Sequence, residues 1–330
     1  MKNLGTKKKG KGEKGKLFFY IALLAFPFLQ FAIMYVAVNF KSIMMVFQRY
    51  VIQDGMGSFQ FLEFENLGMN LVNAFKDLFG IGVSSDYAIS WDMIKNSLTH
   101  YSFSLLIMMP LSLLFSFYII KKFAGWKFFR LLLFIPAIIS PIVLMNVFKI
   151  ICDGIIPEML GKINNVTSDD LEYLSFRFMS HPSKTIPTLL CYSLITGFAS
   201  NVLLYSGAMS GVSVELFDAA QIDGANDFQE FGYIVFPAVW GTFSTFIVVG
   251  IANFFVTDYG LFSVFGQYAD KTIRNIGYYL YINALSGTMS MDGYMRYPYM
   301  AALGVVFTCI AMPLVFGVRY LLRRFGPSEE

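Results

Sequence analysis

Six long apolar segments of this chain contain no lysine, arginine, aspartate or glutamate. A helix needs about 20 mostly apolar residues to cross the hydrocarbon core of a bilayer. Inside lipid, every backbone polar group must be satisfied within the chain, so spanning segments are helices or closed barrels. Charged residues make up only 14% of the chain, against roughly 25% in soluble domains. The sequence therefore predicts an all-α polytopic membrane protein with six spans, at 17–38, 98–120, 131–148, 186–209, 231–257 and 298–318.

Lysine and arginine are concentrated in two tails and one connection between spans, residues 1–16, 121–130 and 319–330. Cytoplasmic loops of membrane proteins carry such an excess of basic residues. Because an even number of spans separates these segments, one orientation places all three, and both termini, in the cytoplasm. No small-residue cleavage site follows the first apolar run, so we expect an uncleaved span. The other long connections would then be extracytoplasmic: 39–97, 149–185 and 258–297.

The connection 210–230 is cytoplasmic by the same alternation, but its charge is opposite. It has no lysine or arginine and carries five carboxylates, those of Glu215, Asp218, Asp223, Asp227 and Glu230. Anionic lipid headgroups would repel such a segment, so we expect it to contact a protein partner. The alternative is a helix lying on the bilayer surface, which the acidic face disfavours.

The same connection has the sequence of a helix–turn–helix. Ser213 can cap a first helix, and Glu215 is favourable near the positive end of its dipole. Gly224 supplies the left-handed residue that commonly ends a helix. Asp227 or Asn226 can cap a second helix, with Glu230 in the capping-box position relative to Asp227.

Residues 218–237 resemble the EAA signature of the membrane subunits of ABC importers, the loop that docks onto the ATPase. The resemblance lies in Asp218-Ala219-Ala220, Asp223-Gly224-Ala225, Phe228, Phe231, Ile234 and Pro237, with aspartate replacing the usual glutamate at 218. It implies an ATPase-coupling site made of Phe217, Asp218, Ala219, Ala220, Asp223, Gly224, Ala225, Phe228, Ile234 and Pro237.

Over 17–318 the chain is similar to the sugar-type permeases related to the larger membrane subunit of the maltose importer. A further landmark is Phe128-Phe129-Arg130 followed by Ile135-Pro136. The likeness implies the type I ABC importer permease fold, a place in the bacterial cytoplasmic membrane, and transport of a carbohydrate, in particular an oligosaccharide. The usual Gly-Gly-Pro after the fifth span is absent, and Thr257-Asp258-Tyr259-Gly260 stands in that region.

The resemblance also implies partners: a second homologous permease in a heterodimer, two ABC ATPase subunits, an extracytoplasmic solute-binding lipoprotein, and membrane lipid. The chain has no Walker-type glycine–lysine loop, so we expect ATP and Mg to be bound by the partner ATPase and no cofactor by this chain. Two histidines and three cysteines lack metal-ligand spacing, so no metal site and no catalytic residue is expected. No nucleic-acid partner is expected.

Polar residues within the spans should face a cavity or the protein interior, because lipid cannot satisfy them. Amides and hydroxyls beside aromatic rings suit the hydroxyl groups and C–H faces of a sugar. The candidate pathway residues are Ser140, Ser193, Gly197, Asn201, Tyr205, Gly250, Asn253 and Thr257. Helix packing through small and polar residues is the alternative for about half of them. We favour Asn201 and Asn253 as groups that face the pathway.

Three other functions remain open. One is an ABC importer permease for a solute that is not a sugar. Another is an ion-coupled secondary transporter, which the lack of intramembrane acids and of internal repeats disfavours. The third is a membrane-embedded enzyme, which would need convergent acids, histidines or a nucleophile near a span end.

Overall fold

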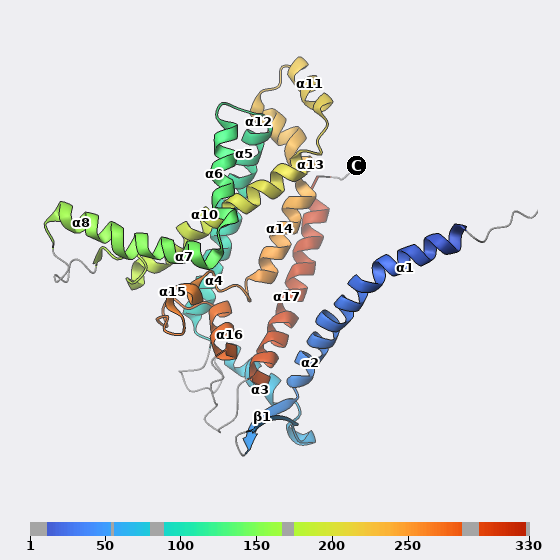
Figure 1. The fold of residues 1–330 in the computed structure, drawn as a ribbon, viewed down its shortest axis with the longest axis vertical. Coiled ribbons are helices and arrows are strands. Elements are labelled where there is room, and N and C mark those ends of the chain that lie inside the picture. The colour runs from blue at the N-terminus through green and yellow to red at the C-terminus, as the bar shows by residue number, and fades with distance from the viewer. Residues whose placement is uncertain (1–11, 54–55, 80–88, 167–174, 286–296, 328–330) are drawn as a thin grey trace, which may run out of the picture. The chain divides into compact units, whose positions relative to one another are not determined.

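The computed structural model describes residues 12–53, 56–79, 89–166, 175–285 and 297–327. These residues form two compact units, which are mostly helical (Figure 1). One comprises 1–75 and 289–305, and the other comprises 76–288 and 306–330.

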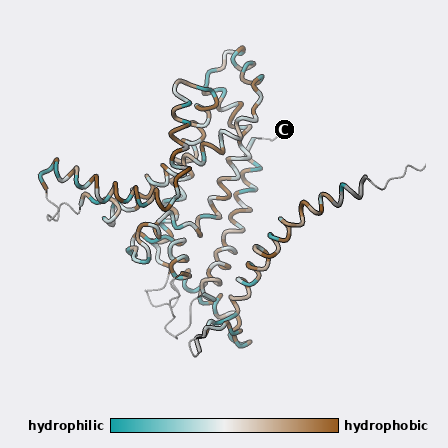
Figure 2. The backbone as a smooth tube through the Cα atoms, viewed as in Figure 1, coloured by the Kyte–Doolittle hydropathy of each residue, from teal (hydrophilic) through white to brown (hydrophobic). Residues whose placement is uncertain are grey.

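The first unit begins with one uninterrupted helix. It runs through α1 (Gly12–Phe31), the π-helical turn η1 (Ala32–Ala37) and α2 (Val38–Met45). Its large apolar side chains are exposed, as a helix facing lipid requires, and Figure 2 shows their hydrophobic colouring along it. The segment predicted at 17–38 is therefore helical, and the helix continues to Met45.

A short hairpin follows this helix. It consists of the antiparallel strands β1 (Gln48–Gln53) and β2 (Met56–Phe61), followed by the 3₁₀ turn η2 (Phe64–Asn66) and by α3 (Met69–Leu78). The Asn70 side chain donates to the carbonyls of Val46 and Gln48, at 2.8 and 3.0 Å. These two bonds hold the start of α3 against the junction between α2 and β1.

Two long helices pack against each other in the second unit. One runs through α4 (Trp91–Phe103), η3 (Ser104–Met108) and α5 (Met109–Ile120), and the other is α10 (Pro182–Met209). The buried Ser116 hydroxyl joins them, because it lies 3.0 Å from the Val202 carbonyl. A further helix, α17 (Tyr297–Phe325), begins in the first unit and ends in the second. Over 98–120, 186–209 and 298–318 the chain is helical throughout, as the sequence predicts.

The segment expected as a third span, 131–148, is not one helix. The chain forms α6 (Trp126–Ile138), α7 (Pro141–Ile150), the π-helical turn η4 (Ile151–Ile155) and α8 (Ile156–Asn164). Ile139 and Ser140 are extended between α6 and α7, with ψ of 138° and 132°. The cause is Pro141, since proline disfavours helical geometry in the residue before it.

The segment expected as a fifth span is helical but bent. It consists of α12 (Asp227–Glu230), η5 (Phe231–Val235), α13 (Phe236–Ala238) and α14 (Trp240–Asn253). The two parts meet at an angle of 66° around Val239. Pro237 accounts for the bend, because its ring clashes with the carbonyl one turn earlier. The helix ends at Asn253, before the predicted end at 257.

By length and composition, four helices among the described residues could cross a membrane, or five if the bent pair is one span. They are Phe19–Met45, Trp91–Ile120, Ser183–Met209 and Tyr297–Phe325, with Asp227–Ala238 plus Trp240–Asn253 as the bent pair. The difference from six arises at the break before Pro141. Six spans and the cytoplasmic placement of both termini stay predictions.

Two clusters of buried side chains stabilise the second unit. The first, which we call the α5–α10 cluster, consists of Leu113, Phe117, Tyr205, Met209, Val235 and Val239. The second lies around α7, α10, α15 (Leu261–Phe265) and α16 (Ile276–Leu285), and includes Met145, Met179, Leu189, Tyr192, Leu261 and Tyr278. The first cluster joins the long helices to the bent fifth segment, and the second joins the α7 helix to the segment after α14.

At Gly277, near the start of α16, the helix packs directly against the backbone of Thr257. A Cβ atom at this position would lie 2.4 Å from the Thr257 carbonyl carbon, which belongs to the backbone and cannot rotate away. We expect Gly277→Ala to lower the free energy of unfolding by about 1–3 kcal/mol through overpacking, which outweighs the roughly 1 kcal/mol gained from helix propensity. Thermal unfolding in detergent measures this change. Gly317→Ala is the matched control, since a Cβ there meets nothing within 4 Å, and its unfolding temperature should stay or rise.

Candidate functional site

The acidic connection folds into the predicted helix–turn–helix. The Ser213 hydroxyl accepts from the Glu215 amide at 3.2 Å and caps α11 (Val214–Ile222). Gly224 has φ of +78°, and the following Ala225 amide donates to the Ala220 carbonyl at 2.9 Å, as in a Schellman turn. Of the two possible caps for the second helix, the structure uses Asn226, in a reciprocal box with Gln229. We call residues 213–230 the coupling segment.

Lys121, at the end of α5, binds the coupling segment. Its ammonium group forms an ion pair with the carboxylate of Glu230, whose side chain is only 1% exposed, and lies 3.8 Å from Asp227. It also lies 5.0 Å from the centre of the Phe217 ring on α11. Two of the five carboxylates thus lie beside one cation of the same chain, which the sequence argument for a purely external partner missed. Glu215, Asp218 and Asp223 remain exposed.

Five of the ten predicted coupling residues are half-buried, and the other five are exposed. Phe217 packs on the α5–α10 cluster, and Ala220, Ala225, Ile234 and Pro237 are half-buried. The other five predicted residues are exposed: Asp218, Ala219, Asp223, Gly224 and Phe228. Ile222 and Phe228 are 86% and 84% exposed, so the segment presents large apolar side chains beside free carboxylates. Such a mixed surface suits a protein partner better than water.

A cavity of about 560 Å³ lies elsewhere in the same unit. Its walls come from α4, η3, the extended break between α6 and α7, α10, and residues 258–263. Hydroxyl-bearing side chains line it beside apolar ones: Ser104, Ser193, Thr196, Ser200 and Ser263 with Phe103, Met108, Pro136, Leu144 and Met145. This combination can contact both the hydroxyl groups and the apolar faces of a small polar solute.

His100, Asp258 and Tyr259 also line this cavity, and the sequence did not single them out as contacts. The buried His100 ring stacks on Tyr259 with centroids 4.2 Å apart. Asp258 accepts from the amides of Gly260 and Phe262, at 3.2 and 3.1 Å, and so shapes the turn into α15. The sequence feature that could have pointed to Asp258 and Tyr259 is the absence of the usual Gly-Gly-Pro at 257–260.

Of the eight predicted pathway residues, Ser193 and Gly197 line the cavity. Ser140 is exposed at the break between two lining residues, Ile139 and Pro141. Asn201 is half-buried and Asn253 is exposed, and neither is among the cavity residues, although both were favoured.

The other three predicted pathway residues have packing roles. Tyr205 is fully buried in the α5–α10 cluster. Gly250 allows the close approach of Tyr101, since a Cβ would lie 2.8 Å from that ring. The Thr257 carbonyl accepts from the Asn275 side chain at 3.3 Å. For these positions the helix-packing alternative describes the structure.

The coupling segment, most of the residues that line the cavity and the end of α17 fall within one matched region of the chain. A family model described as "Binding-protein-dependent transport system inner membrane component" matches residues 121–327. The chain belongs to this family. Its members are transport subunits of ABC importers, so the chain is a multi-pass membrane transport subunit and not an enzyme.

Individual members of this permease family are similar over most of the chain. Protein LplB of Bacillus subtilis is 21% identical over 260 residues, which cover 76% of this chain and 74% of LplB. The arabinooligosaccharides transport system permease protein AraP of Halalkalibacterium halodurans is 26% identical over 241 residues, 72% of each chain. No residue-level roles follow from these identities alone.

The fold agrees with that of a solved transporter. A chain in the crystal structure of a bacterial ABC transporter involved in the import of the acidic polysaccharide alginate superposes with a TM-score of 0.69. The match covers 95% of this chain and 98% of that chain at 19% identity. The ABC importer permease fold implied by the EAA-like sequence is therefore confirmed.

The ion pair of Lys121 allows a quantitative test. We expect Lys121→Met to destabilise the coupling segment by roughly 3–5 kcal/mol, because it leaves the buried Glu230 carboxylate without its cation. Hydrogen exchange of residues 213–230 should accelerate accordingly.

The double variant Lys121→Met/Glu230→Met should recover most of the protection, since apolar replacement of a whole buried pair is often neutral. Lys127→Met, which removes a nearby charge that forms no ion pair among the described residues, serves as the control. A double variant as unprotected as the single one would show that the pair does not fix the segment.

Proposed function

We propose that the chain forms half of the translocation pathway of an ABC importer for a carbohydrate, in particular an oligosaccharide. Its partners would be a second, similar permease, two ATPase subunits and an extracytoplasmic solute-binding protein. The observation that carries the proposal is the EAA-like helix–turn–helix within a chain of the binding-protein-dependent family.

The carbohydrate assignment draws on the relatives. AraP is named for arabinooligosaccharides, and the permease protein NgcF of Streptomyces coelicolor, 23% identical over 212 residues, is named for diacetylchitobiose uptake. The similar solved transporter imports alginate, and a related crystal structure contains an alginate pentasaccharide-bound periplasmic protein. The hydroxyl-lined cavity is compatible with such a solute. The solute-binding protein would bind the solute and deliver it to this chain.

The coupling would act through the anchors of the coupling segment. ATP and Mg on the partner subunits would close the ATPase dimer and displace the exposed surface of α11. Phe217 and the Lys121–Glu230 pair connect this surface to α5, and α12 continues into the bent helix that ends in α14. A displacement of the segment is therefore transmitted to several membrane helices at once, which can open and close the pathway.

A substitution at the left-handed residue Gly224 tests whether the coupling segment connects the chain to the ATPase. Gly224→Val places a β-branched residue at φ of +78°, at a cost of about 1–2 kcal/mol, while its Cβ itself meets no neighbour. We expect ATP-driven uptake in proteoliposomes to fall roughly five- to thirtyfold and co-purification of the ATPase to weaken, with the chain still inserted.

Gly224→Asn is the matched control for this turn, because asparagine tolerates the left-handed region. It should retain most uptake. Normal uptake and ATPase retention in the valine variant would refute the coupling role of the segment.

The cavity is tested separately. We expect Ser193→Trp to block uptake of the carbohydrate by filling the cavity, while ATPase association stays normal because Ser193 is remote from the coupling segment in sequence and contacts. Ser183→Trp on the same helix is the control, since Ser183 is exposed and outside the cavity. Undiminished uptake in Ser193→Trp would remove the cavity from the pathway and leave the coupling proposal untouched.

A further inference from the structure

A second cavity, of about 310 Å³, lies between the end of α5, the start of α6 and the last turns of α10. We call it the basic groove. Its polar side chains are those of Lys122, Trp126, Arg130, Ser206 and Ser210. It shares no residue with the larger cavity, and it contains no residue of the coupling segment.

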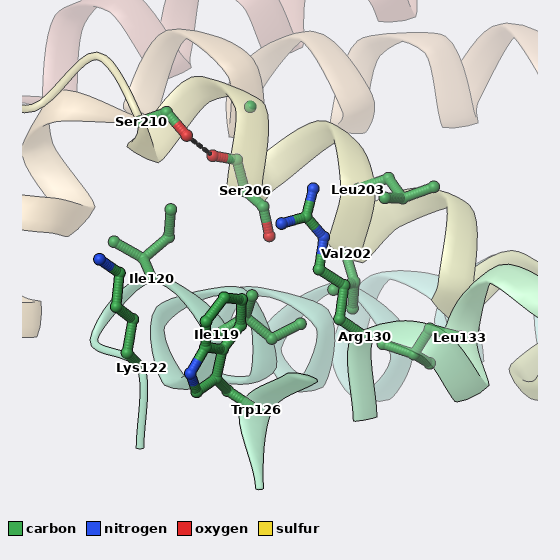
Figure 3. A pocket seen from close by; sticks show the side chains of 11 residues that line it. Ile119, Ile120, Lys122, Trp126, Arg130, Leu133, Val202, Leu203, Ser206 and Ser210 are labelled. Atoms are coloured by element: carbon green, nitrogen blue, oxygen red, sulfur yellow. Dashed lines mark hydrogen bonds between the residues drawn. The ribbon is translucent and has the colours of Figure 1, made fainter. Parts of the chain in front are cut away.

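The basic side chains face α10 across the groove. Lys122 stands in the turn before α6, Trp126 is the first residue of α6, and Arg130 follows one helical turn later. Figure 3 shows the Arg130 guanidinium and the Ser206 hydroxyl pointing toward one another. The Ser206 hydroxyl oxygen is buried and makes no hydrogen bond within the described residues, while Ser210 donates to the Ser206 carbonyl at 2.7 Å. The groove therefore presents two basic side chains beside a buried hydroxyl oxygen, that of Ser206, which makes no hydrogen bond within the described residues.

The charge of the groove is not balanced by its own lining. None of the described residues that line it is acidic. Lys121 and Lys122 are adjacent, but Lys121 is neutralised by Glu230, whereas Lys122 forms no ion pair among the described residues. Lys122 has φ of +55°, so the chain reverses between α5 and α6 at this residue. An anionic group in the groove would be attracted by both cations and could be hydrogen-bonded by Trp126 and Ser206.

The other side chains that line the groove are apolar, which favours an amphipathic ligand. Apolar side chains continue the groove along the helices: Ile119, Ile120, Leu133, Val202 and Leu203. Gly207 leaves it open, because a Cβ at this position meets nothing within 4 Å. The groove lies at the ends of α5 and α10, and α5 is followed directly by Lys121 and Lys122. Basic residues that flank the end of a membrane helix are expected at the level of anionic lipid headgroups. We propose that it binds the phosphate headgroup of an anionic phospholipid, with the acyl chains along the apolar residues.

The test compares two lipids on the full chain, purified in neutral detergent with the subunits that co-purify. After exposure to equal amounts of phosphatidylglycerol and phosphatidylcholine, native mass spectrometry counts the lipids retained. Wild type should retain phosphatidylglycerol in preference. Lys122→Gln/Arg130→Gln should lower this preference by roughly fivefold for each cation removed. The control pair Lys127→Gln/Arg324→Gln removes the same charge outside the groove and should leave the preference unchanged.

A second variant fills the groove without changing charge. Gly207→Leu should abolish the preference, whereas Gly317→Leu, at another open helical glycine, should not. Excess inorganic phosphate should not release the lipid, because it lacks the apolar contacts. Release by phosphate would reassign the groove to a free anion. Equal retention of both lipids by wild type, an equal loss in the control pair, or an unchanged preference in Gly207→Leu would overturn the proposal.

Discussion

The buried ion pair between Lys121 and Glu230 connects the acidic coupling segment to the membrane helices. Glu230 is almost completely removed from solvent, and a carboxylate in that environment is tolerated only with a compensating cation. Lys121 provides it from the end of α5, with the rings of Phe217 and Phe117 beside its side chain. Directly next to this pair, the α5–α10 cluster joins α5 and α10 to the bent fifth segment. The second unit thus has a buried ion pair where its helices converge.

Departures from regular helix give the second unit its cavity. Ile139 and Pro141, at the break between α6 and α7, and the turn that Asp258 shapes both contribute walls to it. Backbone that leaves helical geometry at membrane depth must be buried in protein or line a cavity, because lipid cannot satisfy its polar groups. The break before Pro141 also explains why the third apolar segment is not one straight helix. Together, the break and the turn place polar residues from distant parts of the sequence around one space.

Sequence reasoning succeeded where the signal was local. The Ser213 cap, a second cap at Asp227 or Asn226 and the left-handed Gly224 depend on contacts over a few residues. The structure contains the first and the third, and for the second cap it uses Asn226 with Gln229 in place of Asp227 with Glu230. The sequence says less about a side chain whose surroundings depend on residues of another helix. Tyr205 was a candidate pathway residue and is buried in a cluster, while His100, which was not among the candidates, lines the cavity. A polar residue on an apolar helix shows that it avoids lipid, but not which neighbour it meets.

The charged residues show the same difference between what the sequence determines and what the tertiary structure determines. The sequence alone determined that this chain has long apolar helices, with basic residues at some of their ends and an acidic helix–turn–helix between two of them, since these features depend only on composition and spacing. The family follows from the same residues. Only the tertiary structure decided that Lys121 neutralises Glu230 while the adjacent Lys122 faces a different groove. The physical reason is that an ion pair or a cavity exists only when segments far apart in the chain pack together, and the spacing of residues along one segment does not specify that packing.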